Sequence, residues 1–316
     1  AGRQRLPLDV PQPDRATIGG VLACNACGPR RFGYGTPRDY VLGIRAVDGC
    51  GQVFCGGGRV VKNAAGYNMP RLLVGSFGTL AIVTQVTLLV RPLPESTAFV
   101  IGAPADFAVA ERLLQRLVHS QTLPAAVELL AGSSAISNLR SVINLPTDSG
   151  ICLLVGFEGD AGEVAWMTER LCDEWRAAGL ADMQVVCGET AGSVWNTLIE
   201  NRPDAQISVL PGDTTRMMAR LQQLVPRCSL RAHAGTGLIQ VKLGDEFAST
   251  VRDRLRPAVA AAGGKMVVSA TADGARLSRD DVWGPCDGQR IVMRAIKDRF
   301  DPRGILNPGH FIFDEY

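Results

Sequence analysis

One of the three histidines in this 316-residue chain, His233, lies in a motif that could carry out acid–base chemistry. It belongs to the sequence RAHAGTG, in which two glycines predict a tight turn next to a strand. An imidazole changes its charge near neutral pH, so at such a turn it can take a proton from a bound substrate. A structural histidine, with its hydrogen bonds satisfied inside the turn, is the simpler interpretation, and the residues alone favour it.

The turn Gly75-Ser76-Phe77-Gly78 is a candidate for binding a flat ligand. Glycines permit positive φ angles and a close approach of the backbone to a ligand. The preceding apolar segment 69–74 predicts about two turns of helix, and the alternating apolar residues from Leu80 to Val90 predict a central strand buried on both faces. Backbone amides at such a turn suit a planar cofactor ring with polar edges. The alternative is a plain corner between a helix and a strand, which would need the same residues.

Nine cysteines are too sparse for a disulfide scaffold in a chain of this length, and their number is odd. We therefore expect reduced thiols. Cys24 and Cys27, together with Cys50 and Cys55, form an alternative ligand set for zinc or an iron–sulfur cluster. Four residues separate the members of the second pair, and both pairs lie in glycine-rich turns, so we expect no metal.

Charge and hydropathy narrow the class of protein. The net charge of +2, from 33 basic and 31 acidic residues, argues against binding of nucleic acid. No apolar run reaches the ~18 residues that a membrane span needs, and the first residues do not form a signal peptide. We expect the protein in the cytoplasm, or attached peripherally to the inner membrane.

After Pro94 the pattern changes to strands that alternate with amphipathic helices. Repeated strand–helix–strand units with intervening hairpins predict an antiparallel sheet covered by helices, an α+β fold. The expected strands are 98–102, 127–130, 151–157, 183–187, 206–210, 230–232, 238–243 and 266–270. Upstream of Pro94, the segments 40–47 and 52–55 predict a hairpin joined by a turn.

Three motifs together carry a family resemblance. They are TIGGVLACNACGPRRFGYG (17–35), KNAAGYNMPRLLVGSFGTLAIVTQVTLLVRPLP (62–94) and FDPRGILNPGHF (300–311). The sequences of these motifs resemble those of the FAD-linked oxidase family, which has a flavin domain of the vanillyl-alcohol-oxidase type. Within the family they are most similar to the E subunits of bacterial glycolate oxidases, and the resemblance runs with gaps from about Pro7 to the C-terminus.

The resemblance implies an α+β protein with an incomplete FAD-binding domain of this type and an α+β cap domain with an antiparallel sheet. Its segments would be 1–95 for the C-terminal part of the FAD domain, 96–285 for the cap, and 286–316 for a tail that returns to the FAD domain. The chain has no initiator methionine, and the family's N-terminal subdomain, which grips the FAD pyrophosphate, is not found in it.

The resemblance also implies FAD as the cofactor and assigns residues to it. Thr17 to Gly20 would lie against the flavin, Asn25 and Gly28 beside its ring and ribityl chain, and Lys62 and Tyr67 next to the ring. The paired cations Arg30 and Arg31 would either hold a phosphate or substrate carboxylate or lie in a solvated loop. The full cofactor-binding set is Thr17, Ile18, Gly19, Gly20, Cys24, Asn25, Gly28, Lys62, Gly75, Gly78, Leu80, Ile82 and Asn307.

The implied activity is oxidation of a small 2-hydroxy acid, glycolate to glyoxylate, with electrons passing to the flavin and then to a partner. His233 would take the hydroxyl proton. The family's second histidine is replaced here by Gln240, so we expect no metal site. The implied partners are a homologous flavin D subunit and an iron–sulfur F subunit. The alternative is a non-catalytic assembly subunit that keeps the fold but binds flavin weakly or not at all.

Overall fold

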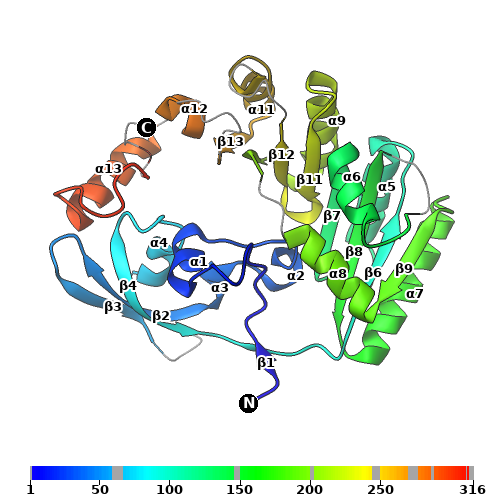
Figure 1. Cartoon of the computed structure of the whole chain (residues 1–316), viewed down its shortest axis with the longest axis horizontal. Coiled ribbons are helices and arrows are strands. Elements are labelled where there is room, and N and C mark those ends of the chain that lie inside the picture. The colour runs from blue at the N-terminus through cyan, green and yellow to red at the C-terminus, as the bar shows by residue number, and fades with distance from the viewer. Residues whose placement is uncertain are drawn as a thin grey trace. The chain divides into compact units, whose positions relative to one another are not determined.

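The computed structural model forms two compact units, each described here by itself. Unit 1 consists of Ala1–Leu93 and Ser278–Tyr316, and unit 2 consists of Pro94–Leu277. The structure describes residues 2–58, 67–145, 150–199, 203–243, 250–269, 277–285, 288–310 and 312. Figure 1 labels most of the helices and strands of the two units.

Unit 1 contains a three-stranded antiparallel sheet with β2 (Val41–Asp48) between β3 (Val53–Gly57) and β4 (Ala81–Leu88). The Asp48 carboxylate accepts the amides of Cys50 and Gln52 at 2.9 and 2.8 Å, which closes the turn of the β2–β3 hairpin. The predicted hairpin is therefore confirmed. A short pair, β1 (Gln4–Arg5) with β5 (Arg91–Pro92), lies apart from that sheet.

The helices of unit 1 are short, apart from the last one. They are α1 (Ile18–Cys24), α2 (Arg31–Tyr34), α3 (Pro37–Tyr40), α4 (Met69–Leu73), α12 (Arg279–Trp283) and α13 (Gln289–Phe300). The predicted helix 69–74 corresponds to α4, where Asn68 caps the first turn by accepting the Arg71 amide at 3.1 Å.

The prediction of a strand buried on both faces from Leu80 onward was wrong. Among the described residues β4 lies at an edge of its sheet, and β2 is the central strand. Leu80 and Ala81 are buried, but Ile82 is 58% exposed and Thr84 and Gln85 are also exposed. The apolar alternation was mistaken for burial because nothing in the described part of unit 1 covers the outer face of β4.

Unit 2 contains an eight-stranded antiparallel sheet, which confirms the predicted α+β fold with an antiparallel sheet (Figure 1). The order of its strands is β13-β10-β12-β11-β7-β8-β6-β9. Their bounds are β6 Ser96–Gly102, β7 Ala126–Ala131, β8 Ile151–Gly159, β9 Met183–Cys187, β10 Ala205–Ser208, β11 Ser229–His233, β12 Leu238–Lys242 and β13 Lys265–Val268.

One face of this sheet is apolar and is covered by helices. Val100, Leu129 and Leu230 on this face are fully buried, in a core that includes side chains of α5 (Phe107–Val118), α7 (Ala161–Ala177), α9 (Thr214–Leu224) and α11 (Arg256–Ala261). A π-helical turn, η3 (Val251–Leu255), leads into α11. Side chains that alternate at period 2 put the other residues of each strand on the opposite face.

The opposite face changes character along the sheet. At the β6 end it is apolar, and the Phe99 ring packs on Trp195 of α8 (Gly188–Ile199) with centroids 4.7 Å apart. Helix α6 (Ser133–Arg140) packs on α8, β7 and β11. The sequence did not predict α6 or α8, because Ser, Gly and Asn weaken the helical signal in both segments. At the β11 end the same face carries polar side chains.

Within the described ranges, no helix combines the length and the apolar character that crossing a lipid bilayer requires.

Candidate functional site

The predicted Thr17–Gly20 turn is the first turn of a helix. Thr17 is the N-cap of α1, and its hydroxyl accepts the Gly20 amide at 3.1 Å. Helix α1 ends at Asn25, which adopts the left-handed conformation with φ 50°. Ile18, Gly19, Gly20 and Cys24 are exposed along it.

The turn from Gly75 to Gly78 docks directly on the end of α1. The Gly75 amide donates to the Leu22 carbonyl at 2.9 Å, and the Phe77 amide donates to the Ala23 carbonyl at 2.7 Å. Gly78 has φ +69°, and a Cβ there would meet only the Asn307 amide nitrogen, at 3.9 Å. The turn therefore needs glycine for its backbone conformation and leaves open space beside it.

The C-terminal tail closes the third side of this surface. Asn307 Nδ2 donates to the Phe77 carbonyl at 2.5 Å. The tail is anchored by Lys297 of α13, whose Nζ donates to the Thr79 carbonyl at 2.8 Å and to Asp301 Oδ2 at 2.7 Å, with both side chains buried. We call the surface formed by α1, the turn 75–78 and Asn307 the α1 surface.

The Lys297–Asp301 pair is a charged anchor in an otherwise exposed region. Burial by itself raises the pKa of Asp301, but hydrogen bonds from Lys297 and from the amides of Leu306 and Ile305 outweigh burial, and the pKa lies below its ordinary value of 3.8. Asp301 is therefore ionised at neutral pH and holds the tail in place.

The α1 surface fits a planar ring with apolar faces and polar edges. Asn25 Oδ1 is buried and has no hydrogen-bond partner among the described residues, although a buried acceptor without one costs about 1–3 kcal/mol. Ile18 is 52% exposed and Phe77 is 39% exposed, so this surface has apolar side chains that a ring could contact. Ile82 of β4 is exposed as well, whereas Leu80 is buried.

Two further residues that the sequence singled out, Gly28 and Arg30, contact Asp9. Gly28 is buried, and a Cβ there would lie 2.7 Å from Asp9 Cβ, so the glycine makes room for Asp9. Asp9 in turn accepts the Arg30 amide at 2.6 Å and pairs with Arg30 Nη1 at 2.5 Å. Arg30 thus forms an ion pair with a fully buried carboxylate, and its side chain is not a solvated loop residue. Tyr67 is exposed, and Lys62 lies outside the described residues.

His233, at the end of β11, contacts a carboxylate that the sequence did not reveal. Its Nδ1 lies 2.5 Å from Oε1 of Glu128 on β7, and the two residues are paired across the strands. Their side chains are 1% and 0% exposed. Glu128 lies within the apolar run AVELLA, and an acid inside a buried strand was the signal that could have identified it.

A cation and an amide complete this buried group. Arg231 Nη2 donates to Gln240 Oε1 at 2.5 Å, and Arg231 Nε lies 3.8 Å from Glu128 Oε2. Gln240 and Arg231 are paired across β12 and β11. We call Glu128, Arg231, His233 and Gln240 the β11 cluster.

The β11 cluster does not fit a divalent metal ion. Gln240, which stands where the resemblance places a second histidine, has its oxygen bonded to Arg231, and the guanidinium puts a fixed positive charge beside Glu128. Throughout the described ranges, no three residues of the types His, Cys, Asp and Glu are grouped as a metal site would need.

The cysteines divide by exposure. Cys24, Cys50 and Cys55 of unit 1 and Cys187 of unit 2 are exposed, whereas Cys152, Cys172 and Cys228 of unit 2 are buried. Burial raises the pKa of the Cys152 thiol to about 12 and that of Cys228 to about 11, so both are inert as nucleophiles at neutral pH.

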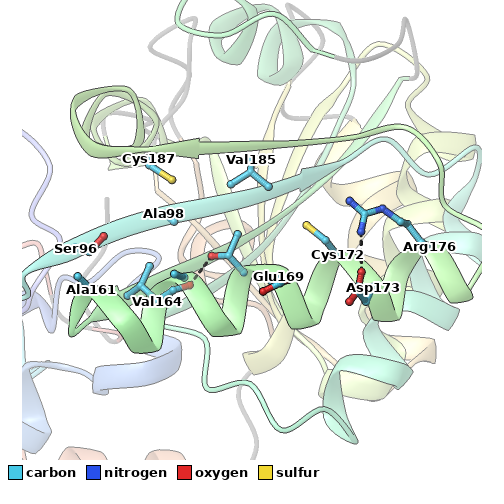
Figure 2. A pocket seen from close by; sticks show the side chains of 12 residues that line it. Ser96, Ala98, Ala161, Val164, Glu169, Cys172, Asp173, Arg176, Val185 and Cys187 are labelled. Atoms are coloured by element: carbon cyan, nitrogen blue, oxygen red, sulfur yellow. Dashed lines mark hydrogen bonds and ion pairs between the residues drawn. The ribbon is translucent and has the colours of Figure 1, made fainter.

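Unit 2 has a hollow of about 380 Å³ that is lined by residues of α7, β6 and β9. Figure 2 shows the side chains that line it. Arg176 and Asp173 pair at 2.7 Å at its rim, and Glu169, Cys172 and Cys187 also line it. None of the residues singled out in the sequence lies here, and the exposed Arg176–Asp173 pair is typical of a helix surface.

Comparison with known proteins identifies the family of the chain. The FAD binding domain family matches residues 2–56, and the C-terminal domain of FAD linked oxidases matches residues 93–205 and 289–311. The chain belongs to the FAD-linked oxidases. FAD is its cofactor, and the match to the FAD binding domain family includes helix α1.

Relatives of this FAD-linked oxidase include subunits of glycolate oxidase. It is 29% identical to the glycolate oxidase subunit GlcE of Escherichia coli, over 97% of this chain and 75% of that protein. It is 25% identical to subunit GlcD of Bacillus subtilis, over 96% and 69%. A D-lactate dehydrogenase of Archaeoglobus fulgidus is 29% identical over 96% and 71%.

Solved structures share the fold. An alkyldihydroxyacetonephosphate synthase structure superposes with a TM-score of 0.66 at 19% identity, covering 98% of this chain. The chain spans about three fifths of that structure, 61% of its length. At this identity the likeness concerns the fold alone.

Proposed function

We propose that this FAD-linked oxidase is the flavin-binding subunit of a complex of the glycolate oxidase type, which oxidises glycolate or a similar small 2-hydroxy acid. The observation that carries the proposal is the buried imidazole of His233, whose Nε2 has no hydrogen-bond partner among the described residues. The similarity to GlcE, GlcD and a D-lactate dehydrogenase supports the class of substrate.

Unit 1 would hold the flavin through the α1 surface. Ile18, Gly19 and Gly20 on α1 and the turn 75–78 would contact the ring, with Asn25 Oδ1 accepting a hydrogen bond from its polar edge. Thr17 and Asn307 would act indirectly, because their side chains are bonded to the protein backbone. When bound, FAD supplies the acceptor for the hydride equivalent that leaves the carbon bearing the hydroxyl.

His233 would supply the base. Oxidation of a 2-hydroxy acid to a 2-oxo acid removes two electrons and two protons, one of them from the hydroxyl oxygen. With Nδ1 turned toward Glu128, Nε2 is the nitrogen that can take the hydroxyl proton. The second proton leaves the carbon together with the electron pair.

Continued turnover would require a partner that accepts the electrons taken from the substrate. We propose a homologous flavin D subunit and an iron–sulfur F subunit as partners, because the glycolate oxidase subunits are among the relatives. A place in the cytoplasm, or at the inner face of a membrane, is part of the same proposal.

The test is anaerobic reduction of the FAD-loaded protein, with its partner subunits present, by glycolate and by each lactate enantiomer. We expect loss of the oxidised-flavin absorbance with at least one of them. His233→Ala should slow this reduction by about 10²–10⁴ and leave flavin content unchanged. His119→Ala is the matched control, since His119 is an exposed residue at the end of α5.

A non-catalytic assembly subunit is the second candidate, and one observation favours it. Gln240 accepts a hydrogen bond from Arg231, and it stands in the place where the family resemblance implies a second histidine. Normal flavin content with no reduction by any 2-hydroxy acid tested, in a complex that still assembles, would replace the catalytic proposal by this one.

A further inference from the structure

The Glu128–His233 contact fixes which nitrogen of the imidazole carries the proton. Nδ1 lies 2.5 Å from Oε1, and a carboxylate group that accepts this hydrogen bond places the hydrogen on Nδ1. In the neutral ring the lone pair then lies on Nε2, and this is the nitrogen that is buried without a hydrogen-bond partner in the described structure. The tautomer is the one that a proton acceptor needs.

The sheet makes this arrangement rigid. His233 and Glu128 face each other across β11 and β7 in regular antiparallel register, so both Cβ atoms point to the same side of the sheet. Beyond His233 the chain turns at Gly237, where φ is +71° and a Cβ would lie 2.1 Å from the Val209 carbonyl oxygen. The Thr236 hydroxyl donates to the His233 carbonyl at 3.1 Å. The backbone of His233 is therefore fixed by its strand pairing with β7 and by the hydrogen bond from Thr236.

The charges around the ring favour uptake of a proton by Nε2. Glu128 on β7 puts a negative charge next to Nδ1, and Arg231 on β11 lies on the far side of that carboxylate, 3.8 Å from Oε2. Helix α6 also packs on β7 and β11, and its described charged side chain is the exposed Arg140 at its last turn. Glu128 is thus the nearest charge to the imidazole, and it stabilises the imidazolium that proton transfer creates.

We propose that Glu128 is a positioning residue for the reaction, which holds His233 in the Nδ1–H tautomer and stabilises its protonated form. The inference rests on the proposed role of His233 as the base. Arg231 and Gln240 complete the arrangement, because the guanidinium offsets the charge of Glu128 and is itself oriented by Gln240. No metal ion takes part in this scheme.

Glu128→Gln tests the proposal with little change in size. Its amide can donate to Nδ1 and so stabilises the other tautomer, with the proton on Nε2. In the FAD-loaded complex we expect the plateau of kcat/KM to fall on the order of 10². Loss of the negative charge makes the imidazolium less favourable, so the acid limb of the kcat/KM profile should move to lower pH.

A second readout does not depend on turnover. With only three histidines in the chain, ¹⁵N NMR of the imidazoles can be assigned by comparison with His233→Ala. The parent should show His233 protonated at Nδ1 in its neutral form, and Glu128→Gln should show protonation at Nε2. Asp204→Asn is the control for losing a buried carboxylate in unit 2, since Asp204 accepts the Leu243 amide away from the β11 cluster. It should change neither the tautomer nor the pH profile.

The outcomes separate the two proposals. If His233→Ala reduces flavin as fast as the parent, the proposed function loses its base and the inference falls with it. If His233→Ala is slow but Glu128→Gln keeps the parent's plateau, acid limb and tautomer, the role of Glu128 alone is overturned. If Glu128→Gln only lowers stability, as Asp204→Asn would, Glu128 is structural and the inference is likewise overturned.

Discussion

The α1 surface of unit 1 and the β11 cluster of unit 2 are built in opposite ways. The α1 surface uses backbone groups and glycines of three distant segments, and much of it is exposed. The β11 cluster uses charged side chains on regular strands, nearly all of them buried. The α1 surface is held by the buried Lys297–Asp301 pair, which is not itself part of the surface. In the β11 cluster, the functional side chains hold one another in place.

This difference teaches where each region is vulnerable. A surface made of backbone depends on what holds the segments together, so its weak point is the buried ion pair and the turn conformation. A cluster of paired buried side chains fails when one member leaves another unpaired. Three substitutions in unit 1 test whether its anchor, its turn and its helix cap contribute in that order.

Lys297→Met should have the largest effect, because it leaves Asp301 buried without its cationic partner. We expect unit 1 to lose about 3–5 kcal/mol of unfolding free energy, measured by urea denaturation. Lys265→Met is the control, since Lys265 is an exposed residue of β13. A loss no larger than that of the control would mean that the ion pair is not the anchor of the tail.

The same anchor predicts a pH dependence. The pKa of Asp301 is lowered in the folded state, so its contribution to stability is complete above the ordinary carboxyl value of 3.8 and is lost as the pH falls from there toward the folded value. Asp301→Asn should remove this part of the acid sensitivity. An unchanged slope of stability against pH below that value would contradict the assignment.

Gly78→Val should have the next largest effect, on flavin retention. A β-branched residue at φ +69° costs at least about 1–2 kcal/mol, and reshaping the turn would displace the backbone from the α1 surface. Gly179→Val is matched, since Gly179 has φ +87° and open space around its Cβ position but lies in unit 2. We expect FAD loss on gel filtration for Gly78→Val only; equal flavin content in both would place the turn away from the cofactor.

Thr17→Ala should have the smallest effect. It removes the N-cap of α1, which costs about 1 kcal/mol, whereas Thr17→Ser keeps the hydroxyl and should behave like the parent. The melting temperature of unit 1 checks this. Should Thr17→Ser lose flavin as readily as Thr17→Ala, the methyl group would have a role at the cofactor that capping does not explain.

The sequence predicted the parts of the site that depend on local conformation. The turn at Gly75 and Gly78, the helix 69–74 and the antiparallel sheet of unit 2 are all in the structure, because glycine spacing and apolar periodicity act within a few residues. The sequence did not predict the order of the strands or the exposure of β4, because both depend on which surfaces other segments of the chain cover.

Glu128 shows why the β11 cluster was only half predicted. His233 was visible through its glycine motif, but its partner is 105 residues away and lies in a run of apolar residues. Gly28 gives a second example, since the sequence did not reveal that Asp9 fills the space next to it. Pairings that arise from tertiary structure leave little trace in one sequence.

The split of unit 1 into two chain segments sets the order in which the protein matures on the ribosome. Thr79 and Lys297, whose hydrogen bond ties the turn to the tail, are 218 residues apart. At about 5–20 residues per second, the tail follows the turn by roughly ten to forty seconds. All of unit 2 is synthesised in that interval, while the turn 75–78 still lacks its contacts with Asn307 and Lys297 of the tail. We infer that the nascent chain is most exposed to aggregation in this window, and that capacity to hold FAD is the last property it acquires.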